Sequence, residues 1–322
     1  MKTLNIIISM MLIMASQAMT AGNAHRPVVP HASKEAKALL NYIYSIEGEK
    51  VLSGQQGMHE YEYVKEVTGH YPAIKGHDLI REKENQQVVE SIIDWWNRGG
   101  IPTLMWHWGA PSMGEGYENS KKEIDIDRCF QEGTPEHKAM WADLERVADW
   151  LTVLRDAHVP VLWRPMHECD GDWFWYGKGT GEQFCRLWHT MFNYFTKERK
   201  LNNLIWVLCH CGQPLDSFDP GEGYYDIVGA DSYNSERIRK EMYDKVISIH
   251  GTSRPVTYHE CGTIPDPDLC KQAGVDWVWW MLWSREYLTT YDKEDLIRIY
   301  NHDRILTLDE LPDIMKYLHR RH

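Results

Sequence analysis

The stretch of sequence that decides the fold is VPVLWRPMHE, which covers Val159–Glu168. Pro160 marks an abrupt start, an apolar run follows, and the stretch ends in a carboxylate. Such a run is typical of a parallel strand that is covered on both faces. A second stretch, PVTYHECG over Pro255–Gly262, repeats the form and contains Glu260 near its end. We therefore expect two parallel strands, each with a glutamate close to the point where the chain leaves the sheet.

Six other runs have a similar length, and we expect each of them to be a strand as well. In chain order, the eight runs are Lys50–Gly57, Tyr71–Asp78, Ile101–Trp108, Val159–Glu168, Leu204–Cys211, Ile227–Tyr233, Pro255–Gly262 and Trp277–Ser284. Segments with helical spacing lie between them. One segment starts at Thr134-Pro135 and then carries apolar residues three or four positions apart, namely Met140, Leu144, Val147, Leu151 and Leu154.

Strand alternating with helix predicts an α/β fold with a closed parallel sheet, the (β/α)8 TIM barrel, in a single domain. The doubly wound open sheet is the main alternative. That fold often carries a glycine-rich phosphate-binding turn after its first strand. The segment Gly54-Gln55-Gln56-Gly57 does not match that turn.

The first 24 residues have the layout of a secretory signal peptide. Lys2 provides a positive start, Leu4–Met14 is largely apolar, and small residues follow up to Ala24. The apolar run is too short to span a bilayer. We expect residues 1–24 to be a signal peptide, residues 25–322 to form one folded domain, and the protein to be exported to the periplasm or the cell exterior, without a membrane span.

The composition bears on the kind of ligand. The net charge is −12, with 47 acidic and 35 basic residues, which argues against binding to nucleic acid. The chain has 15 tryptophans, many of them beside polar residues, as in proteins that stack aromatic rings on sugars. Its cysteines number 7, so at least one must be free in an exported chain. Cys209 and Cys211 flank His210, but without a second cluster we expect buried thiols and no zinc site.

Polar and aromatic residues stand at the ends of most of the expected strands. They include Gln55-Gln56, His77-Asp78, His107-Trp108, His167-Glu168, Asp231-Ser232-Tyr233, His259-Glu260 and Trp283. In a (β/α)8 barrel these ends form one rim, where catalytic groups lie. Glu168 and Glu260 would then face one another, and two carboxylates are what the hydrolysis of a glycosidic bond needs.

Several motifs resemble glycoside hydrolase family 26. The signature is Trp163-Arg164-Pro165-Met166-His167-Glu168 with Gly171 and Trp173-Phe174-Trp175-Tyr176-Gly177. Further similar segments are Met105–Pro111, Gly229–Tyr233 and Ile305–Pro312, in the order in which they occur in the family. The resemblance covers nearly all of residues 25–322 and implies a catalytic barrel of the retaining type.

The resemblance also implies roles for seven residues. Glu168 matches the acid/base and Glu260 matches the nucleophile. The positions that match substrate-binding residues are His107, His167, Trp173, Tyr233 and Trp283, and Tyr233 matches the tyrosine that donates to the nucleophile. Trp279 and Trp280, which precede Trp283 in the same expected strand, are alternatives for the position that Trp283 matches. No metal and no cofactor are expected.

The implied function is hydrolysis of β-1,4-mannosidic bonds in mannan or galactomannan, with retention of configuration. A β-1,3-1,4-glucan or a β-xylan is an alternative substrate for the same barrel and mechanism. A non-catalytic carbohydrate-binding barrel is a further alternative, but both glutamates are present. A metal-dependent hydrolase is another, but the histidines at the strand ends lack the spacing of ligands.

The sequence departs from the family pattern beside both glutamates. Cys169 and Cys261 each follow a catalytic glutamate directly, and the residues alone give no functional account of this. Asp170 and Asp172 stand where the family often has neutral residues. Their charges would raise the pKa of Glu168 if they lay close to it, which would suit an acid.

Overall fold

Parallel strands close into an eight-membered barrel in the computed structural model, which describes residues 26–319. The ring runs β2-β3-β4-β5-β6-β7-β8-β9, and β9 pairs with both β8 and β2 to close it. The expected (β/α)8 barrel is therefore confirmed, and the open sheet is excluded. The signal peptide expected over residues 1–24 lies outside the described residues.

The strands correspond to the eight expected runs, with one addition near the C-terminus. Their bounds are β1 Val51–Leu52, β2 Gly54–Gln56, β3 Ile74–Asp78, β4 Ile101–Trp106, β5 Val161–Pro165, β6 Leu204–His210, β7 Ile227–Ser232, β8 Val256–Cys261, β9 Trp277–Leu282 and β10 Ile305–Leu306. The first expected strand is split into β1 and β2 at Ser53. Strand β2, which follows the split, pairs with β3. Strand β1 pairs with β9 and with the added strand β10.

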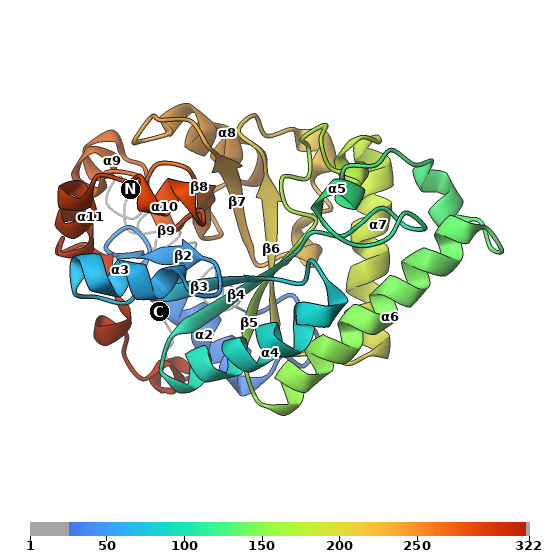
Figure 1. The fold of residues 1–322 in the computed structure, drawn as a ribbon, viewed down its shortest axis with the longest axis horizontal. Coiled ribbons are helices and arrows are strands. Elements are labelled where there is room, and N and C mark those ends of the chain that lie inside the picture. The colour runs from blue at the N-terminus through green and yellow to red at the C-terminus, as the bar shows by residue number, and fades with distance from the viewer. Residues whose placement is uncertain (1–25, 320–322) are drawn as a thin grey trace, which may run out of the picture.

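Helices surround the barrel on the outside (Figure 1). Their bounds are α2 Lys34–Ile46, α3 Glu60–Thr68, α4 Glu82–Asn97, α5 Tyr117–Ser120, α6 Pro135–Asp156, α7 Gly181–Asn193, α8 Lys240–His250, α9 Pro267–Ala273, α10 Glu286–Thr289 and α11 Lys293–Tyr300. As the sequence predicts, α6 begins after Thr134, whose side chain accepts a hydrogen bond from the backbone of His137. Within residues 26–319, no helix has the length and apolar character to cross a bilayer.

Helix α2 closes the N-terminal end of the barrel. Its apolar side chains, among them Leu39 and Ile43, share a buried cluster with Ile74, Ile101 and Ile227, the first residues of three strands. That end of the barrel is thereby filled with apolar side chains and sealed from water. The opposite end, where the strands finish, is left for polar residues.

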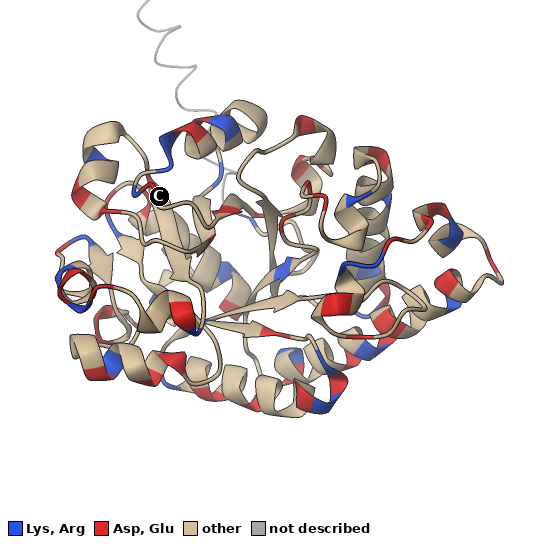
Figure 2. Ribbon diagram, turned by 45° about the horizontal axis from the view of Figure 1, so that its top comes forward, with Lys and Arg blue, Asp and Glu red and all other residues tan. Residues whose placement is uncertain are grey.

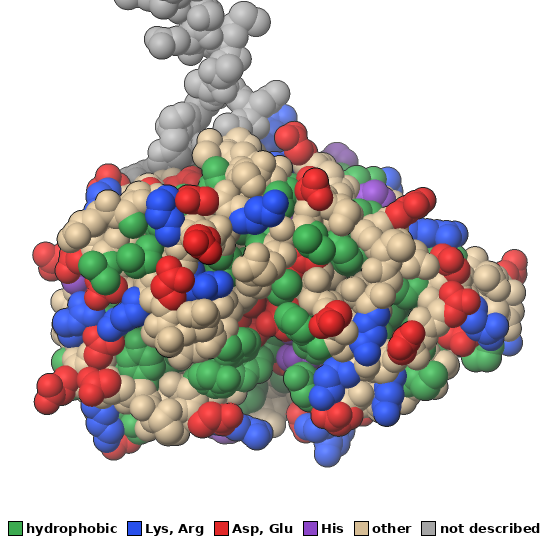
Figure 3. Space-filling view, turned by 90° about the horizontal axis from the view of Figure 1, so that it is seen from above, with side chains coloured by type: hydrophobic (Ala, Val, Ile, Leu, Met, Phe, Trp, Pro, Cys, Tyr) green, Lys and Arg blue, Asp and Glu red, His purple; other side chains and the backbone are tan. Residues whose placement is uncertain are grey.

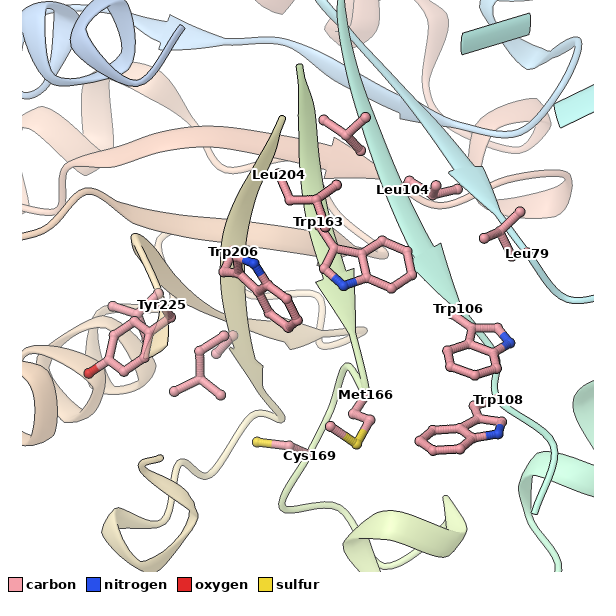
Figure 4. Close-up of a cluster of buried hydrophobic side chains, with 14 of the residues drawn as sticks. Leu79, Leu104, Trp106, Trp108, Trp163, Met166, Cys169, Leu204, Trp206 and Tyr225 are labelled. Carbon is pink, nitrogen blue, oxygen red and sulfur yellow. The ribbon is translucent and has the colours of Figure 1, made fainter. Parts of the chain in front are cut away.

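A second apolar layer lies between the strands and the outer helices. Figure 4 shows part of it, with Trp163 on β5 and Trp206 on β6 side by side, and with Trp106 and Trp108 along β4 and the segment after it. Most of the tryptophans are buried in such positions, and Trp173 is an exception at 38% exposed. Charged residues lie mostly on helices and loops, and the strands carry few of them (Figure 2). The outer faces of the strands are thus packed with large apolar side chains.

A matched pair of substitutions on α6 tests this packing. Val147 is fully buried against the barrel, whereas Val153 on the same helix is 45% exposed. We expect Val147→Ala to lower the free energy of unfolding by about 2 kcal/mol through lost burial and a cavity. Val153→Ala should change it by less than about 0.5 kcal/mol. Urea unfolding followed by tryptophan fluorescence measures both, and equal losses would contradict the assigned faces of α6.

Candidate active site

The strand ends bring the seven predicted site residues to one rim of the barrel. They stand at or after the ends of β4, β5, β7, β8 and β9, and they are His107, His167, Glu168, Trp173, Tyr233, Glu260 and Trp283. In Figure 1 the arrows of β6 and β7 point upward, so the view from above in Figure 3 faces this rim. That view shows a hollow near the centre with acidic side chains inside it.

Glu168 lies in a turn three residues beyond β5, and not on the strand as expected from the sequence. The strand ends at Pro165, and both Met166 and Glu168 adopt left-handed backbone conformations, with φ of 46° and 50°. Such conformations cost free energy in residues other than glycine and persist only where the surroundings hold them. The turn carries the Glu168 carboxyl into the barrel mouth, where it is 9% exposed.

The surroundings of Glu168 favour its protonated form. Burial raises the pKa of this carboxyl well above its ordinary value, and the charges of Asp231 and Glu260 act in the same direction. The indole N–H of Trp173 donates to Glu168 Oε2 at 2.6 Å and opposes this shift. The sequence suggested Asp170 as a cause of this shift. The Asp170 carboxylate instead bonds to His210 at 2.7 Å. Glu168 therefore has the properties of a general acid, which stays protonated until it donates its proton to a leaving group.

Glu260 has the opposite surroundings, because positive charge and donors face it. The Arg164 guanidinium is fully buried and bonds to Glu260 Oε1 and, at 2.8 Å, to Asp231 Oδ2. The Tyr233 hydroxyl donates to Glu260 Oε2 at 2.7 Å. Asp231 also accepts the backbone N–H of Glu260 at 2.8 Å, which fixes the residue from behind. These bonds stabilise an ionised carboxylate with a defined orientation.

The backbone of β8 is adjusted at the position of Glu260. Its register against β9 shifts on both sides of Tyr258, and its register against β7 shifts between Ala230 and Ser232. Irregularities of this kind turn a strand and re-aim its side chains, and they are common beside active sites. Here they accompany the point at which the nucleophile candidate enters the barrel mouth.

Aromatic side chains form the walls around the two carboxyls. Trp173 is bonded to Glu168, and Tyr233 is bonded to Glu260. The Trp283 ring lies between His107 and Tyr233, with ring-centre distances of 6.4 and 6.3 Å. By contrast, Trp279 and Trp280 are fully buried in the core, so of the three only Trp283 belongs to the rim. Trp173 and Tyr233 are exposed and Trp283 is half-buried, and aromatic rings of this kind suit the apolar faces of sugar rings.

Two histidines complete the site. The His107 ring donates to Asp78 at 2.6 Å, and its centre lies 4.5 Å from that of His167. Burial lowers the pKa of His107, but the Asp78 carboxylate outweighs burial and leaves it above the ordinary value. Burial and the nearby positive charges lower the pKa of His167, so His167 is neutral. Its Nδ1 has no partner within the described residues and is free to meet a ligand hydroxyl.

The site also contains residues that were not predicted from the sequence. Arg164 and Asp231 stood inside recognised motifs, but nothing in their spacing showed that they bond to one another. Asp78 stood at a strand end, and its partner His107 is 29 residues away in the chain. Phe174 packs against both His107 and His167, with ring-centre distances of 5.4 and 4.9 Å. The one available signal was an arginine inside the apolar run of β5.

Among residues 26–319, two groups of side chains have donor atoms close enough together for a metal ion. In each group these atoms lie within 4.8 Å of one another, and the groups are Glu168, Asp231 and Glu260, and Cys169, Asp170 and His210. In the first group Arg164 already supplies the compensating positive charge. In the second, His210 Nδ1 and Asp170 Oδ2 are 2.7 Å apart, which is a hydrogen-bond distance. Two nitrogen or oxygen ligands of a tetrahedral zinc ion would lie about 3.3 Å apart.

The arrangement combines a neutral carboxylic acid with an ionised carboxylate across a short gap. One oxygen of Glu168 and one of Glu260 lie within 4.8 Å of each other. Retaining glycosidases have carboxyl groups about 5–5.5 Å apart, whereas inverting enzymes need about 6.5–9.5 Å to admit a water molecule. The geometry therefore suits attack by one carboxylate and proton donation by the other.

Comparison with known proteins also points to a glycoside hydrolase. The model of glycosyl hydrolase family 26 matches residues 28–310. A mannan endo-1,4-beta-mannosidase of Thermothelomyces thermophilus is 30% identical over 303 residues, which covers 88% of this chain and 62% of the relative. The chain spans 50–62% of the length of the first curated relatives that it matches.

Solved structures agree in both fold and sequence. The GH26-CBM35 beta-(1,4)-mannanase of Podospora anserina has a TM-score of 0.84 and 30% identity, and the match covers 90% of this chain and 70% of that one. A beta-mannanase from a symbiotic protist of the termite Reticulitermes speratus, solved with a gluco-manno-oligosaccharide, has a TM-score of 0.81 and 30% identity, with coverages of 89% and 98%. With the family match over nearly the whole described chain, these likenesses show that the protein belongs to glycosyl hydrolase family 26.

Proposed function

We propose that this protein is a retaining glycoside hydrolase that cleaves β-1,4-mannosidic bonds in mannan or galactomannan. The observation that carries the proposal is the pairing of Glu168, whose pKa is raised by burial, with Glu260, which is held by Arg164 and Tyr233. Pairs of carboxyls with such different surroundings define the acid and the nucleophile of a glycosidase. The names of the relatives, which are mannan endo-1,4-beta-mannosidases, support the choice of substrate.

In the first step, a Glu260 oxygen attacks the anomeric carbon while the bond from that carbon to the leaving oxygen breaks. Glu168 donates its proton to that oxygen, so the shortened chain leaves as a neutral alcohol. The ester of the glycosyl-enzyme is neutral, and the negative charge that Glu260 carried is now on the deprotonated Glu168. Tyr233 and Arg164 orient Glu260 for the attack through the bonds that they make to its two oxygens.

In the second step, water takes the place of the departed alcohol. Glu168, now ionised, removes a proton from the water, which attacks the anomeric carbon and displaces Glu260. Two inversions at one carbon give net retention. His107 and His167 lie beside this position and offer a donor and an acceptor for sugar hydroxyls, while Trp173 and Trp283 offer aromatic faces.

We further propose that the protein works outside the cytoplasm. This rests on the layout of residues 1–24, with Lys2 before the apolar run Leu4–Met14 and small residues up to Ala24. A polysaccharide too large to enter a cell fits this location. All seven cysteines are free thiols, and most of them are buried away from oxidants.

A panel of polymers tests the proposed substrate. We expect purified protein to release oligosaccharides from β-1,4-mannan or galactomannan faster than from lichenan or xylan. Reducing-end release at equal polymer mass measures the rates, and Glu260→Ala serves as the control for contaminating activity. Comparable or higher rates on lichenan or xylan would overturn the choice of mannan, and no release from any polymer would overturn the proposed hydrolase.

The pH profile tests the role of Glu168. The Trp173 indole stabilises the ionised form of Glu168, so Trp173→Phe should raise its pKa. Because the acid must be protonated to act, the basic limb of the kcat/KM profile should move to higher pH. Trp283→Phe is the matched control, since no hydrogen bond joins Trp283 to Glu168 among the described residues, and its basic limb should stay in place. A basic limb that moves to lower pH in Trp173→Phe, or equally in both variants, would refute the assignment.

A further inference from the structure

A series of four buried polar side chains leads away from the acid/base turn. Asp170 Oδ2 lies 2.7 Å from His210 Nδ1, and His210 Nε2 lies 2.8 Å from His250 Nε2. The series ends at Tyr225, whose hydroxyl lies 2.8 Å from His250 Nδ1. The four residues come from the turn after β5, the last position of β6, the last position of α8, and the segment before β7. Within residues 26–319, none of the four is hydrogen-bonded to Glu168 or Glu260.

The protons of this series can be arranged so that each of the three contacts is a hydrogen bond. Asp170 accepts the Nδ1 proton of His210, which leaves a lone pair on His210 Nε2. His250 then donates its Nε2 proton to that lone pair, and its own Nδ1 accepts the Tyr225 hydroxyl. Both imidazoles are neutral in this arrangement. Burial lowers the pKa of His250 to about 4, which agrees with a neutral ring. In this arrangement every donor points from Tyr225 toward Asp170, and the Asp219 carboxylate lies beside the Tyr225 end, 3.8 Å from His250 Nδ1.

Asp170 connects this series to the backbone that carries Glu168. Its carboxylate also accepts the backbone N–H groups of Cys211 and Leu215, both at 2.8 Å. Asp170 therefore ties the turn after β5 to the segment after β6 through three charge-assisted bonds. Within the turn itself, the backbone N–H of Gly171 donates to the Glu168 carbonyl at 3.0 Å. A displacement of Asp170 would therefore also displace Glu168, which is two residues away in the chain.

Glu168 needs such an anchor because its backbone is strained. The left-handed conformations at Met166 and Glu168 are disfavoured for residues with a Cβ, so the turn would relax if its contacts were lost. Cys169 contributes one further bond, from its backbone N–H to the Cys209 carbonyl at 3.1 Å. The hydrogen bond between the Asp170 carboxylate and the His210 ring is also made from this turn. It is fully buried, and the low local dielectric strengthens it.

We propose that Asp170, His210, His250 and Tyr225 are positioning residues, which hold the turn of Glu168 so that its carboxyl reaches the leaving oxygen. This inference rests on the proposed function, because it assigns the series to the acid/base of a retaining hydrolase. It also gives a role to Asp170, which lies two residues after Glu168 in the same turn. Substitutions in this series should therefore impair proton transfer by Glu168 more than they impair attack by Glu260.

Two substrates with the same sugar and different leaving groups separate these effects. Mannotetraose needs protonation of its leaving oxygen, whereas 2,4-dinitrophenyl β-mannobioside does not. In Asp170→Asn, an amide N–H must face a donor, because the carboxylate accepts from three groups. We expect kcat/KM on mannotetraose to fall about 10- to 100-fold, as for a slightly misplaced catalytic group. On the dinitrophenyl substrate kcat/KM should change less than about threefold, because its first step needs no acid. Added azide should raise kcat on this substrate by replacing the water that Glu168 activates.

Tyr225→Phe tests the far end of the series with a smaller change, should Asp170→Asn fail to fold. The matched control is Tyr300→Phe, since the buried Tyr300 hydroxyl has no partner among the described residues. We expect Tyr225→Phe to lose about three- to tenfold in kcat/KM on mannotetraose alone, and Tyr300→Phe to lose nothing. Equal losses on both substrates, or no loss in either series variant, would overturn the positioning role. Wild-type protein inactive on both substrates would instead overturn the proposed function.

Discussion

The Arg164 guanidinium lies buried between Asp231 and Glu260, and the arrangement of the active site depends on it. Oxygens of three carboxyls come within 4.8 Å of one another in this barrel mouth. Without a cation, like charges at this distance would force protons onto more than one of them. Arginine keeps its charge at any working pH and offers donors in a fixed plane, so it can serve two carboxylates at once. Glu260 and Asp231 share this charge, although burial still raises the pKa of Asp231 to about 7, and burial favours the protonated form of Glu168.

The rest of the fold supports this buried cation. Arg164 also contacts Met105 and Cys209, at 2.9 Å and 3.8 Å from their sulfur atoms, so strands β4 and β6 enclose it on both sides. Soft, weakly polar neighbours leave the guanidinium to bond to the carboxylates. Helix α2 seals the opposite end of the barrel with apolar side chains, which keeps water from reaching the site from below. The layer of tryptophans outside the strands keeps the strand ends in fixed positions.

Much of the fold could be predicted from the sequence because parallel strands covered on both faces read as apolar runs, and those runs end in polar residues. Glu168 and Glu260 followed from this pattern and from the family motifs. The environment of Asp170 could not be predicted, because His210 lies 40 residues away and only the closed barrel brings the two side chains together. The role of Arg164 was hidden for the same reason, since its two partners come from other strands. The turn at Glu168 was missed because its left-handed backbone follows from tertiary contacts, and the local sequence shows no glycine there.

The most direct test of the account is to trap the covalent intermediate. A dinitrophenyl β-mannobioside with fluorine at C2 of the reacting sugar should glycosylate the enzyme rapidly and release the sugar slowly. Mass spectrometry of proteolytic fragments should then find the added sugar on the peptide that contains Glu260, and wild-type protein should lose activity in step with labelling. Label on the peptide that contains Glu168, or steady turnover of unmodified substrate with no labelled peptide, would contradict the assignment of Glu260 as the nucleophile.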